Sequence, residues 1–222
     1  VNVPPVSIPI EILPIFIYPF IKLLILIFKF INMNKTNKIV LNITKEISDC
    51  VNTINIDSIN QAIYLINNSQ RIFLSGSGRS KLSISSFAMR LMHLEKNAYI
   101  VGDVTTPSIT KNDLLIIASG SGKTKSVILT AHQAKEIGSK ILLFTHNLNS
   151  ELFKLSDYHI HIPSPYFNTI DYTNTTKSIQ PIATLFEQSI LILSDIIILQ
   201  IINSSKNPID LSKPFPLHAN LQ

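Results

Sequence analysis

The residues best suited to chemistry lie in a short Gly/Ser segment, residues 119–124 (SGSGKT). It follows an apolar run, Leu114 to Ala118, and precedes a segment with helical periodicity, Lys125 to Ile137. A loop between a strand and a helix N-terminus presents free backbone N–H groups and the positive end of a helix dipole. Phosphate suits such a loop, because amides and hydroxyls can donate to its oxygens. A simple turn without a ligand is the alternative interpretation.

A second segment of the same kind follows an earlier strand candidate, Ile72 to Leu74, and reads SGSGRS over residues 75–80. Two such loops after two strands of one sheet favour a binding pocket more than either alone. Arg79 in this loop is a candidate for contact with an anion or a hydroxyl, with a surface salt bridge as its alternative. The nucleotide motifs GxxxxGK[ST] and GxGxxG do not occur. The pattern therefore favours a small phosphorylated metabolite, and a sugar in particular.

These loops need a sheet to position them, and the chain from Arg71 onward has a strand-loop-helix rhythm. The pattern predicts an α/β fold: a doubly wound, mostly parallel five-stranded sheet with helices on both faces, flavodoxin-like or Rossmann-like. Strands are expected at 72–74, 98–101, 114–118, 140–144 and 158–162. Helices are expected between them at 81–94, 125–137 and 150–155, with Gly138 ending the second of these.

Helices are also expected at both ends of this sheet. Residues 37–68 have helical periodicity, with Asp57 as the expected N-cap of the second part. A polar loop at 163–180 is long enough to suggest a function. The helix that follows, from Pro181 or Ile182 to Asn203, is so apolar that it lies either in the core or between subunits, and we expect an oligomer interface. Glu187 and Asp195 argue against a membrane span.

Composition excludes several classes of protein. The 222 residues include one cysteine, Cys50, so an intrachain disulfide and a zinc site built from cysteines are excluded. A reducing, cytoplasmic location is the economical expectation. The net charge of +5 is modest and the Lys and Arg residues are scattered, so we expect no nucleic-acid partner. The histidines and carboxylates show no metal-ligand spacing, so no metal and no cofactor are expected.

Residues 1–32 differ from the rest, because they are rich in Ile, Phe, Leu and Pro. We expect a mis-assigned start, with the natural protein beginning at Met33, and a single domain over residues 33–222. A membrane anchor is the alternative, weakened by Pro14, Pro19 and Lys22, so a membrane partner is not expected. Mass spectrometry of the natural N-terminus distinguishes the two, since a mature chain that begins before Met33 contradicts the expectation.

Chemistry on a phosphosugar needs an acid/base group near the loops. Glu187 is the outstanding carboxylate, because it lies near the start of the apolar final helix, directly after the polar loop. Its alternative role is that of a charge partner for the helix dipole. His93 ends an amphipathic helix, where a histidine is usually a cap or a core residue. His218 lies in a proline-rich tail, where packing explains it less well.

The segment SGSGKT resembles the phosphosugar-binding signature of the sugar isomerase (SIS) superfamily. Three further segments resemble 6-phospho-3-hexuloisomerases: Phe87 to Leu94 (FAMRLMHL), residues 102–107 (GDVTTP) and the terminal His218 to Leu221 (HANL). The resemblance runs from about Asn37 to Gln222. The chain departs from the family at residues 183–187, which read ATLFE where GTTFE-like sequences occur, and at Gln222, where an acidic residue is common.

The resemblance implies an enzyme that interconverts D-arabino-hex-3-ulose 6-phosphate and D-fructose 6-phosphate through a cis-enediol(ate), as in the ribulose monophosphate pathway of formaldehyde fixation. It implies a homotetramer with its sites at subunit contacts, and no cofactor. It assigns Glu187 as the base, with His218 or else His93 assisting. Substrate and phosphate contacts are implied for Ser119, Gly120, Ser121, Gly122 and Thr124 of one loop, and for Gly76, Ser77 and Arg79 of the other. The alternatives are another SIS phosphosugar aldose–ketose isomerase and a non-catalytic module that senses a phosphosugar.

Overall fold

The structure is a computed structural model, and it describes residues 17–165, 178–205, 215 and 217–220. Most of the polar loop 163–180 and residues 1–16 of the N-terminal segment therefore lie outside the described residues. The contacts divide the chain into two units, residues 1–44 and 45–222, which are described separately. The first unit is helical from Ile17, and its helix α1 continues to Asn52 in the second. Its described side chains at residues 21–26 and 39–41 are exposed.

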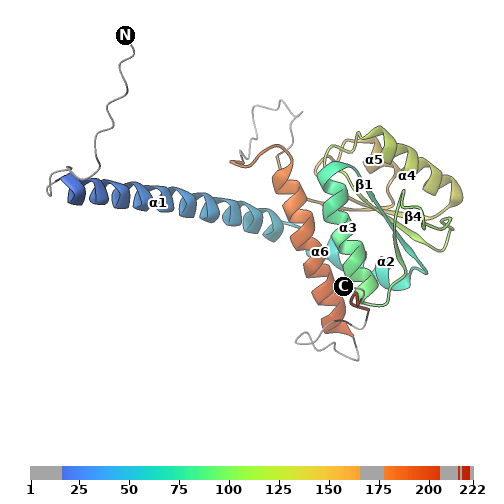
Figure 1. The fold of residues 1–222 in the computed structure, drawn as a ribbon. Coiled ribbons are helices and arrows are strands. Elements are labelled where there is room, and N and C mark those ends of the chain that lie inside the picture. The colour runs from blue at the N-terminus through green and yellow to red at the C-terminus, as the bar shows by residue number, and fades with distance from the viewer. Residues whose placement is uncertain (1–16, 166–177, 206–214, 216, 221–222) are drawn as a thin grey trace, which may run out of the picture. The chain divides into compact units, whose positions relative to one another are not determined.

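The second unit is built on five parallel strands, which confirms the predicted five-stranded sheet, and their order is β2-β1-β3-β4-β5. The strands are β1 (Ile72–Gly76), β2 (Ala98–Ile100), β3 (Leu114–Ala118), β4 (Lys140–Thr145) and β5 (Tyr158–His161). The helices are α2 (Ile56–Asn68), α3 (Gly78–His93), α4 (Lys125–Ile137), α5 (Glu151–Leu155) and α6 (Thr184–Ser204). Every side chain of β3 is buried, because helices cover both faces of a doubly wound sheet (Figure 1).

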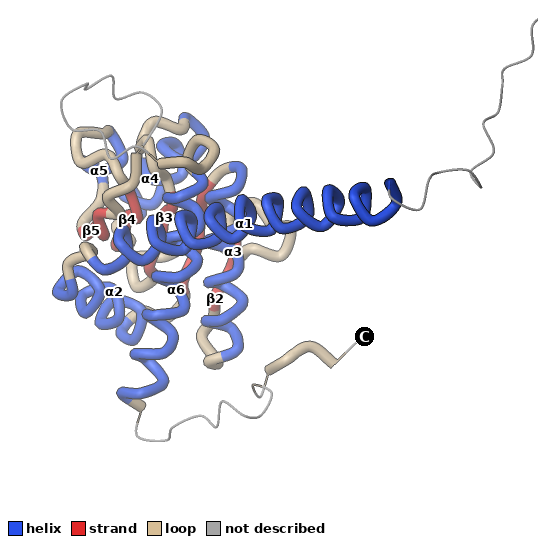
Figure 2. The backbone as a smooth tube through the Cα atoms, turned by 90° about the vertical axis from the view of Figure 1, so that its left-hand side faces the viewer, coloured by secondary structure: helices blue, strands red, loops and turns tan. Residues whose placement is uncertain are grey.

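The strands lie among the helices (Figure 2), and their alternate residues feed two separate cores. On one face, Leu74, Ile116 and Phe144 pack with residues of α2, α3 and α6. On the other face, Phe73 and Ile117 pack with residues of α4 and α5. The two helices that follow β1 and β3, α3 and α4, therefore lie on opposite faces of the sheet.

Several helix boundaries differ from the sequence predictions, and the start of α6 at Thr184, predicted at Pro181 or Ile182, is one of them. The predicted N-cap Asp57 is wrong, because α2 begins at Ile56 and its N-cap is Asn55, whose side chain accepts from Asp57 N–H at 2.7 Å. The helix predicted from Lys81 starts three residues earlier, at Gly78. The prediction for α4 is confirmed at both ends, and Gly138 ends it in a left-handed conformation with φ +88°.

Helix α6 lies partly in the core. Its side chains Leu193, Ile197 and Ile201 are buried, whereas Leu191 and Leu199 are exposed. Among the described residues, α6 alone is long and apolar enough to cross a membrane, and 56% of that window is buried inside the protein. Burial of this extent is typical of a core helix. One face of α6 therefore lies in the core, which is one of the two positions that its apolar sequence allows.

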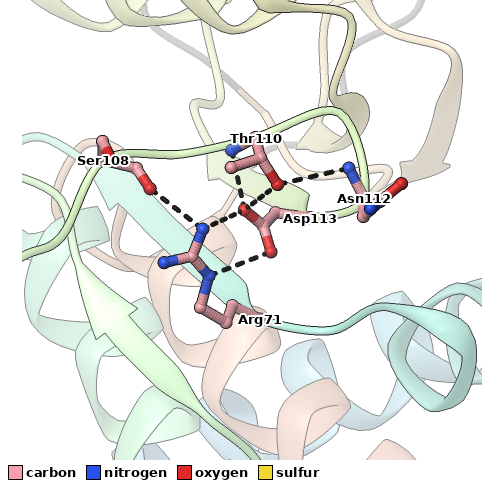
Figure 3. Close-up of polar contacts among 5 residues, drawn as sticks. All are labelled: Arg71, Ser108, Thr110, Asn112 and Asp113. Carbon is pink, nitrogen blue, oxygen red and sulfur yellow. Dashed lines mark hydrogen bonds and ion pairs between the residues drawn. The ribbon is translucent and has the colours of Figure 1, made fainter.

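An ion pair links the segments that precede β1 and β3, at the amino ends of the strands (Figure 3). Arg71, directly before β1, donates from Nε and Nη2 to the two carboxylate oxygens of Asp113, directly before β3, at 3.1 and 2.8 Å. Asp113 also accepts from the backbone and hydroxyl of Thr110, and Arg71 donates to the carbonyl of Ser108. Burial raises the pKa of Asp113, but the bonds from Arg71 and Thr110 outweigh it and hold that pKa below its ordinary value. This network ties the loop before β3 to the start of β1.

Candidate functional site

The two Gly/Ser loops meet at the carboxyl edge of the sheet. Strands β1 and β3 are neighbours, with Gly76 paired to Ala118 at their ends. From this point the chain turns toward β2 on one side and toward β4 on the other. A crevice forms at such a switch point, because the two following helices diverge to opposite faces. The structure therefore brings together the two loops that the sequence singled out.

The first loop leads directly into α3. A Cβ at Gly76 would come within 3.1 Å of the Lys81 backbone and 3.3 Å of the Ala118 carbonyl, so only glycine lets the helix approach the strand this closely. Ser77 is the N-cap of α3, yet its hydroxyl makes no capping hydrogen bond. Gly78 has φ +54° and Arg79 lies in the first turn. Ser77 and Arg79 are both exposed.

The second loop is held by its own serines. Buried Ser119 accepts from the N–H of Gly122 at 3.2 Å, and Ser121 accepts from the N–H of Lys123 at 3.2 Å. Gly122 has φ +64° and lies directly against Ser150, so a side chain has no room there. Thr124 is the N-cap of α4 and, like Ser77, makes no side-chain capping hydrogen bond.

The site therefore holds two helix N-termini whose cap hydroxyls are not engaged in capping. An N-cap Ser or Thr normally accepts from an N–H of the first turn. Here the first turns of α3 and α4 lack that partner, and both helices are long enough to carry a dipole. The arrangement can bind an anion such as a phosphate group.

Glu187 joins this site through the first turn of α6. Its carboxylate accepts from Arg79 Nε at 2.6 Å, and its side chain is 9% exposed, against 64% for Arg79. The preceding side chain, Phe186, packs on the second loop, since a Cβ at Gly120 would be 3.3 Å from its ring. The N-cap of α6 is Ala183, which adopts a left-handed conformation with φ +63°. A buried carboxylate paired with a guanidinium thus lies beside both loops.

The structure brings the two predicted histidines together, but away from Glu187. His93 is buried at the end of α3, and its ring stacks on Phe215 and His218 with centroids 5.3 and 5.6 Å apart. Burial, with the nearby charges of Arg90 and His218, lowers the pKa of His93. Arg79 and His93 lie at opposite ends of α3, which at a helical rise of 1.5 Å per residue places them about 21 Å apart.

Sequence reasoning missed one segment of the site, residues 145–147 after β4. The Thr145 hydroxyl and the N–H groups of His146 and Asn147 all donate to the carbonyl of Gly120. The available signal was position alone, because the carboxyl end of β4 lies at the same sheet edge as the loops. His146 and His161 also lie there with ring centroids 6.0 Å apart, and burial lowers the pKa of both.

Comparison with known proteins adds a family and named relatives. The family model described as "SIS domain" matches residues 65–192. A Bacillus subtilis protein named 3-hexulose-6-phosphate isomerase is 40% identical over 189 residues, which cover 85% of this chain and 100% of the relative. A Mycobacterium gastri protein of the same name is 36% identical, over 68% of this chain and 74% of the relative. A Methanococcus jannaschii crystal structure, from which a 3-hexulose-6-phosphate isomerase function was inferred, matches with a TM-score of 0.70 and 31% identity. That match covers 83% of this chain and 99% of the other.

Proposed function

Because this chain belongs to the SIS domain family and, within it, to the 3-hexulose-6-phosphate isomerases, we propose that it interconverts D-arabino-hex-3-ulose 6-phosphate and D-fructose 6-phosphate. The relative from Bacillus subtilis supports this substrate by its name and by a match that covers its whole length. The structural observation that carries the chemistry is the buried carboxylate of Glu187 beside two uncapped helix N-termini.

The phosphate group binds at the two loops. Hydroxyls of Ser77, Ser121 and Thr124 and the amides at the starts of α3 and α4 donate to its oxygens. Ser119, Gly120 and Gly122 shape the second loop, and Gly76 lets α3 approach it. Held there, the sugar chain extends toward Glu187, which lies next to the same loops.

The reaction moves a carbonyl from C3 to C2 of the sugar. Glu187 takes the proton from C2, and the C2–H electron pair forms the C2=C3 double bond of an enediolate with negative charge on the C3 oxygen. The proton then returns from Glu187 to C3 on the same face, as the C2 hydroxyl proton passes to the C3 oxygen. C2 is oxidised as C3 is reduced, so the reaction consumes no redox cofactor. Arg79 holds the Glu187 carboxylate in place through the 2.6 Å bond.

Replacement Glu187→Gln tests the base. The amide keeps an oxygen that accepts from Arg79 but cannot take a proton, so kcat falls about 10²- to 10⁴-fold. The assay makes the hexulose phosphate in situ and reads out fructose 6-phosphate. Glu151→Gln is the matched control, since Glu151 is exposed and pairs with His132 outside the site. Near-full turnover of Glu187→Gln would refute the assignment. Tight phosphosugar binding by the wild type without turnover would favour the sensor instead.

A histidine assists from a neighbouring subunit in this proposal. His93 and His218 lie together at the far end of α3 from Arg79, so within one chain neither is close to Glu187. A cytoplasmic homotetramer with sites at subunit contacts brings the tail of one copy to the loops of another. Exposed apolar side chains on α3 and α6 support such contacts, namely Leu82, Met89, Leu191, Ile192 and Leu199.

Mixed oligomers test this arrangement. Glu187→Gln and His218→Ala chains are each expected to be weakly active alone. Together they should regain activity after unfolding and joint refolding, because some sites then combine an intact Glu187 with an intact His218. Light scattering gives the number of subunits. Full activity after removal of residues 217–222, or a monomer with full activity, would contradict the proposal.

A further inference from the structure

The second loop rests on a fixed support formed by the segment that follows β4. The carbonyl of Gly120 accepts from Thr145 Oγ1 at 3.2 Å, from His146 N–H at 3.3 Å and from Asn147 N–H at 3.2 Å. The carbonyl of Ser121 accepts from Asn147 Nδ2 at 3.0 Å. The carbonyl of Gly122 accepts from Leu152 N–H at 3.4 Å, at the start of α5. Three successive carbonyls of the loop are thus directed toward this support.

The direction of a carbonyl determines the direction of the next amide. In a planar trans peptide the C=O and the N–H of the following residue point in opposite directions. The N–H groups of Ser121, Gly122 and Lys123 are therefore directed away from the support. Two of them donate to the hydroxyls of Ser119 and Ser121, whose own O–H groups stay available to donate. The Ser121 N–H and these hydroxyls are then the donors that the loop can offer to an anion.

The side chain of Asn147 holds the peptide between Ser121 and Gly122. Gly120 O has three donors, so losing one leaves two. For Ser121 O, in the part of the chain that the structure describes, the carboxamide of Asn147 is the donor. The other end of that carboxamide accepts from Asn149 N–H at 2.9 Å, which fixes its orientation with the NH₂ group toward the loop.

We propose that Asn147 is a positioning residue for phosphate binding. By holding the Ser121 carbonyl, it fixes the peptide between Ser121 and Gly122, and with it the hydroxyls of Ser119 and Ser121, before the substrate arrives. The inference rests on the proposed function, because it assumes that the loop binds the phosphate of a sugar. Asn147 contributes to substrate affinity, whereas proton transfer belongs to Glu187.

Substitution Asn147→Asp separates this role from simple packing. The carboxylate keeps the shape and still accepts from Asn149 N–H, but it cannot donate to Ser121 O and faces that carbonyl with a negative charge. Loss of one such bond weakens binding about tenfold. We expect the KM for the phosphosugar to rise by about that factor, with kcat within about threefold of wild type. Asn147→Ala serves as a second, uncharged variant, and Asn149→Ala is the matched control because its backbone N–H remains.

The decisive measurement is the rise in thermal midpoint produced by inorganic phosphate. Wild type and Asn149→Ala are expected to show the same rise, and both Asn147 variants a smaller one, with midpoints without phosphate as the reference for folding. A variant that keeps the wild-type rise and KM would overturn the role of Asn147, as would a fall in kcat alone. A wild type that phosphate does not stabilise overturns both the phosphate site and this role. If phosphate stabilises the wild type more than the Asn147 variants but the wild type shows no isomerase activity, the role of Asn147 is supported and only the assigned reaction is contradicted.

Discussion

The substitution Gly122→Ala makes a demanding test of the second loop. Gly122 has φ +64°, a conformation that L-residues rarely adopt, and an added Cβ would overlap the Oγ and Cβ of Ser150. Gly78, in the first loop and at the start of α3, offers a matched control. It has φ +54°, but an added Cβ there meets nothing within 4 Å.

Both substitutions place an L-residue in a left-handed conformation, but only Gly122→Ala also produces a steric overlap. The left-handed conformation costs a non-glycine residue about 1–2 kcal/mol at either position. At Gly122 the overlap with Ser150 adds about 1–3 kcal/mol of strain. The free energy of unfolding should therefore fall by about 2–5 kcal/mol for Gly122→Ala and by about 1–2 kcal/mol for Gly78→Ala. At about 2–4 °C per kcal/mol for a chain of this size, the expected losses in thermal midpoint are about 4–20 °C and 2–8 °C.

Thermal or urea unfolding of four chains isolates the steric part: wild type, Gly122→Ala, Ser150→Gly and the double variant. In the Ser150→Gly background the obstructing atoms are gone, so Gly122→Ala should cost only about 1–2 kcal/mol. Ser150→Gly also loses the N-cap bond to Phe153, which the single variant measures. Equal losses for Gly122→Ala and Gly78→Ala, or no coupling between Gly122 and Ser150, would refute the argument.

Three further predictions follow from the ion pair, the buried histidines and the second loop. Asp113→Asn should lower the free energy of unfolding by about 1–3 kcal/mol, because the buried side chain at this position loses its charge-assisted hydrogen bonds from Arg71. Because the pKa of Asp113 is lowered in the folded chain, the stabilisation by the ion pair is present above about pH 4 and is lost as the pH falls further. Urea unfolding of wild type and variant at about pH 7 measures this stabilisation. Acidification from pH 7.5 to 5.5 should lower the thermal midpoint. Burial lowers the pKa of His93, His146 and His161 in the folded chain, so below about pH 6.5 the unfolded chain binds more protons than the folded chain does. Gly120→Ala should lower kcat about tenfold or more in the coupled assay, because the methyl group displaces Phe186 and with it the neighbouring carboxylate of Glu187.

Each of these has a contradicting result. Asp113→Asn with wild-type stability at pH 7 would mean that the pair contributes nothing. A thermal midpoint that stays constant between pH 7.5 and 5.5 would mean that the three histidines titrate alike in the folded and unfolded chains. Wild-type turnover by Gly120→Ala would show that the carboxylate does not depend on the contact between Phe186 and the loop.

Local sequence predicted the parts of the fold that depend on neighbouring residues. Helix α4 is predicted at both ends because a loop rich in glycine and serine precedes it and Gly138 follows it. The predicted N-cap of α2 is wrong because Asn55 and Asp57 are both residues that cap well. The burial of Ile59 and Ala62 decides between them, because it determines where the first turn of the helix begins. The start of α3 is predicted three residues too late, because residues 78–80 belong to a Gly/Ser segment of the kind that is typical of a loop.

The contacts between distant residues could not be predicted in the same way. Arg79 and Glu187 are 108 positions apart, and only the packing of α6 on α3 brings them to 2.6 Å. Sequence identified both residues as candidates, but not their pairing. Asn147 gave no signal at all, since its bonds are to backbone carbonyls, which every residue has.

Ala183 shows how the chain turns into α6. Its φ of +63° lies in the left-handed region, which glycine adopts without strain. An alanine adopts this conformation at a cost of about 1–2 kcal/mol. The buried face of the helix, with Leu185 and Phe186 in the core, fixes the entry. The direction in which α6 starts, and with it the position of Glu187, is therefore held by packing against the local preference of the backbone.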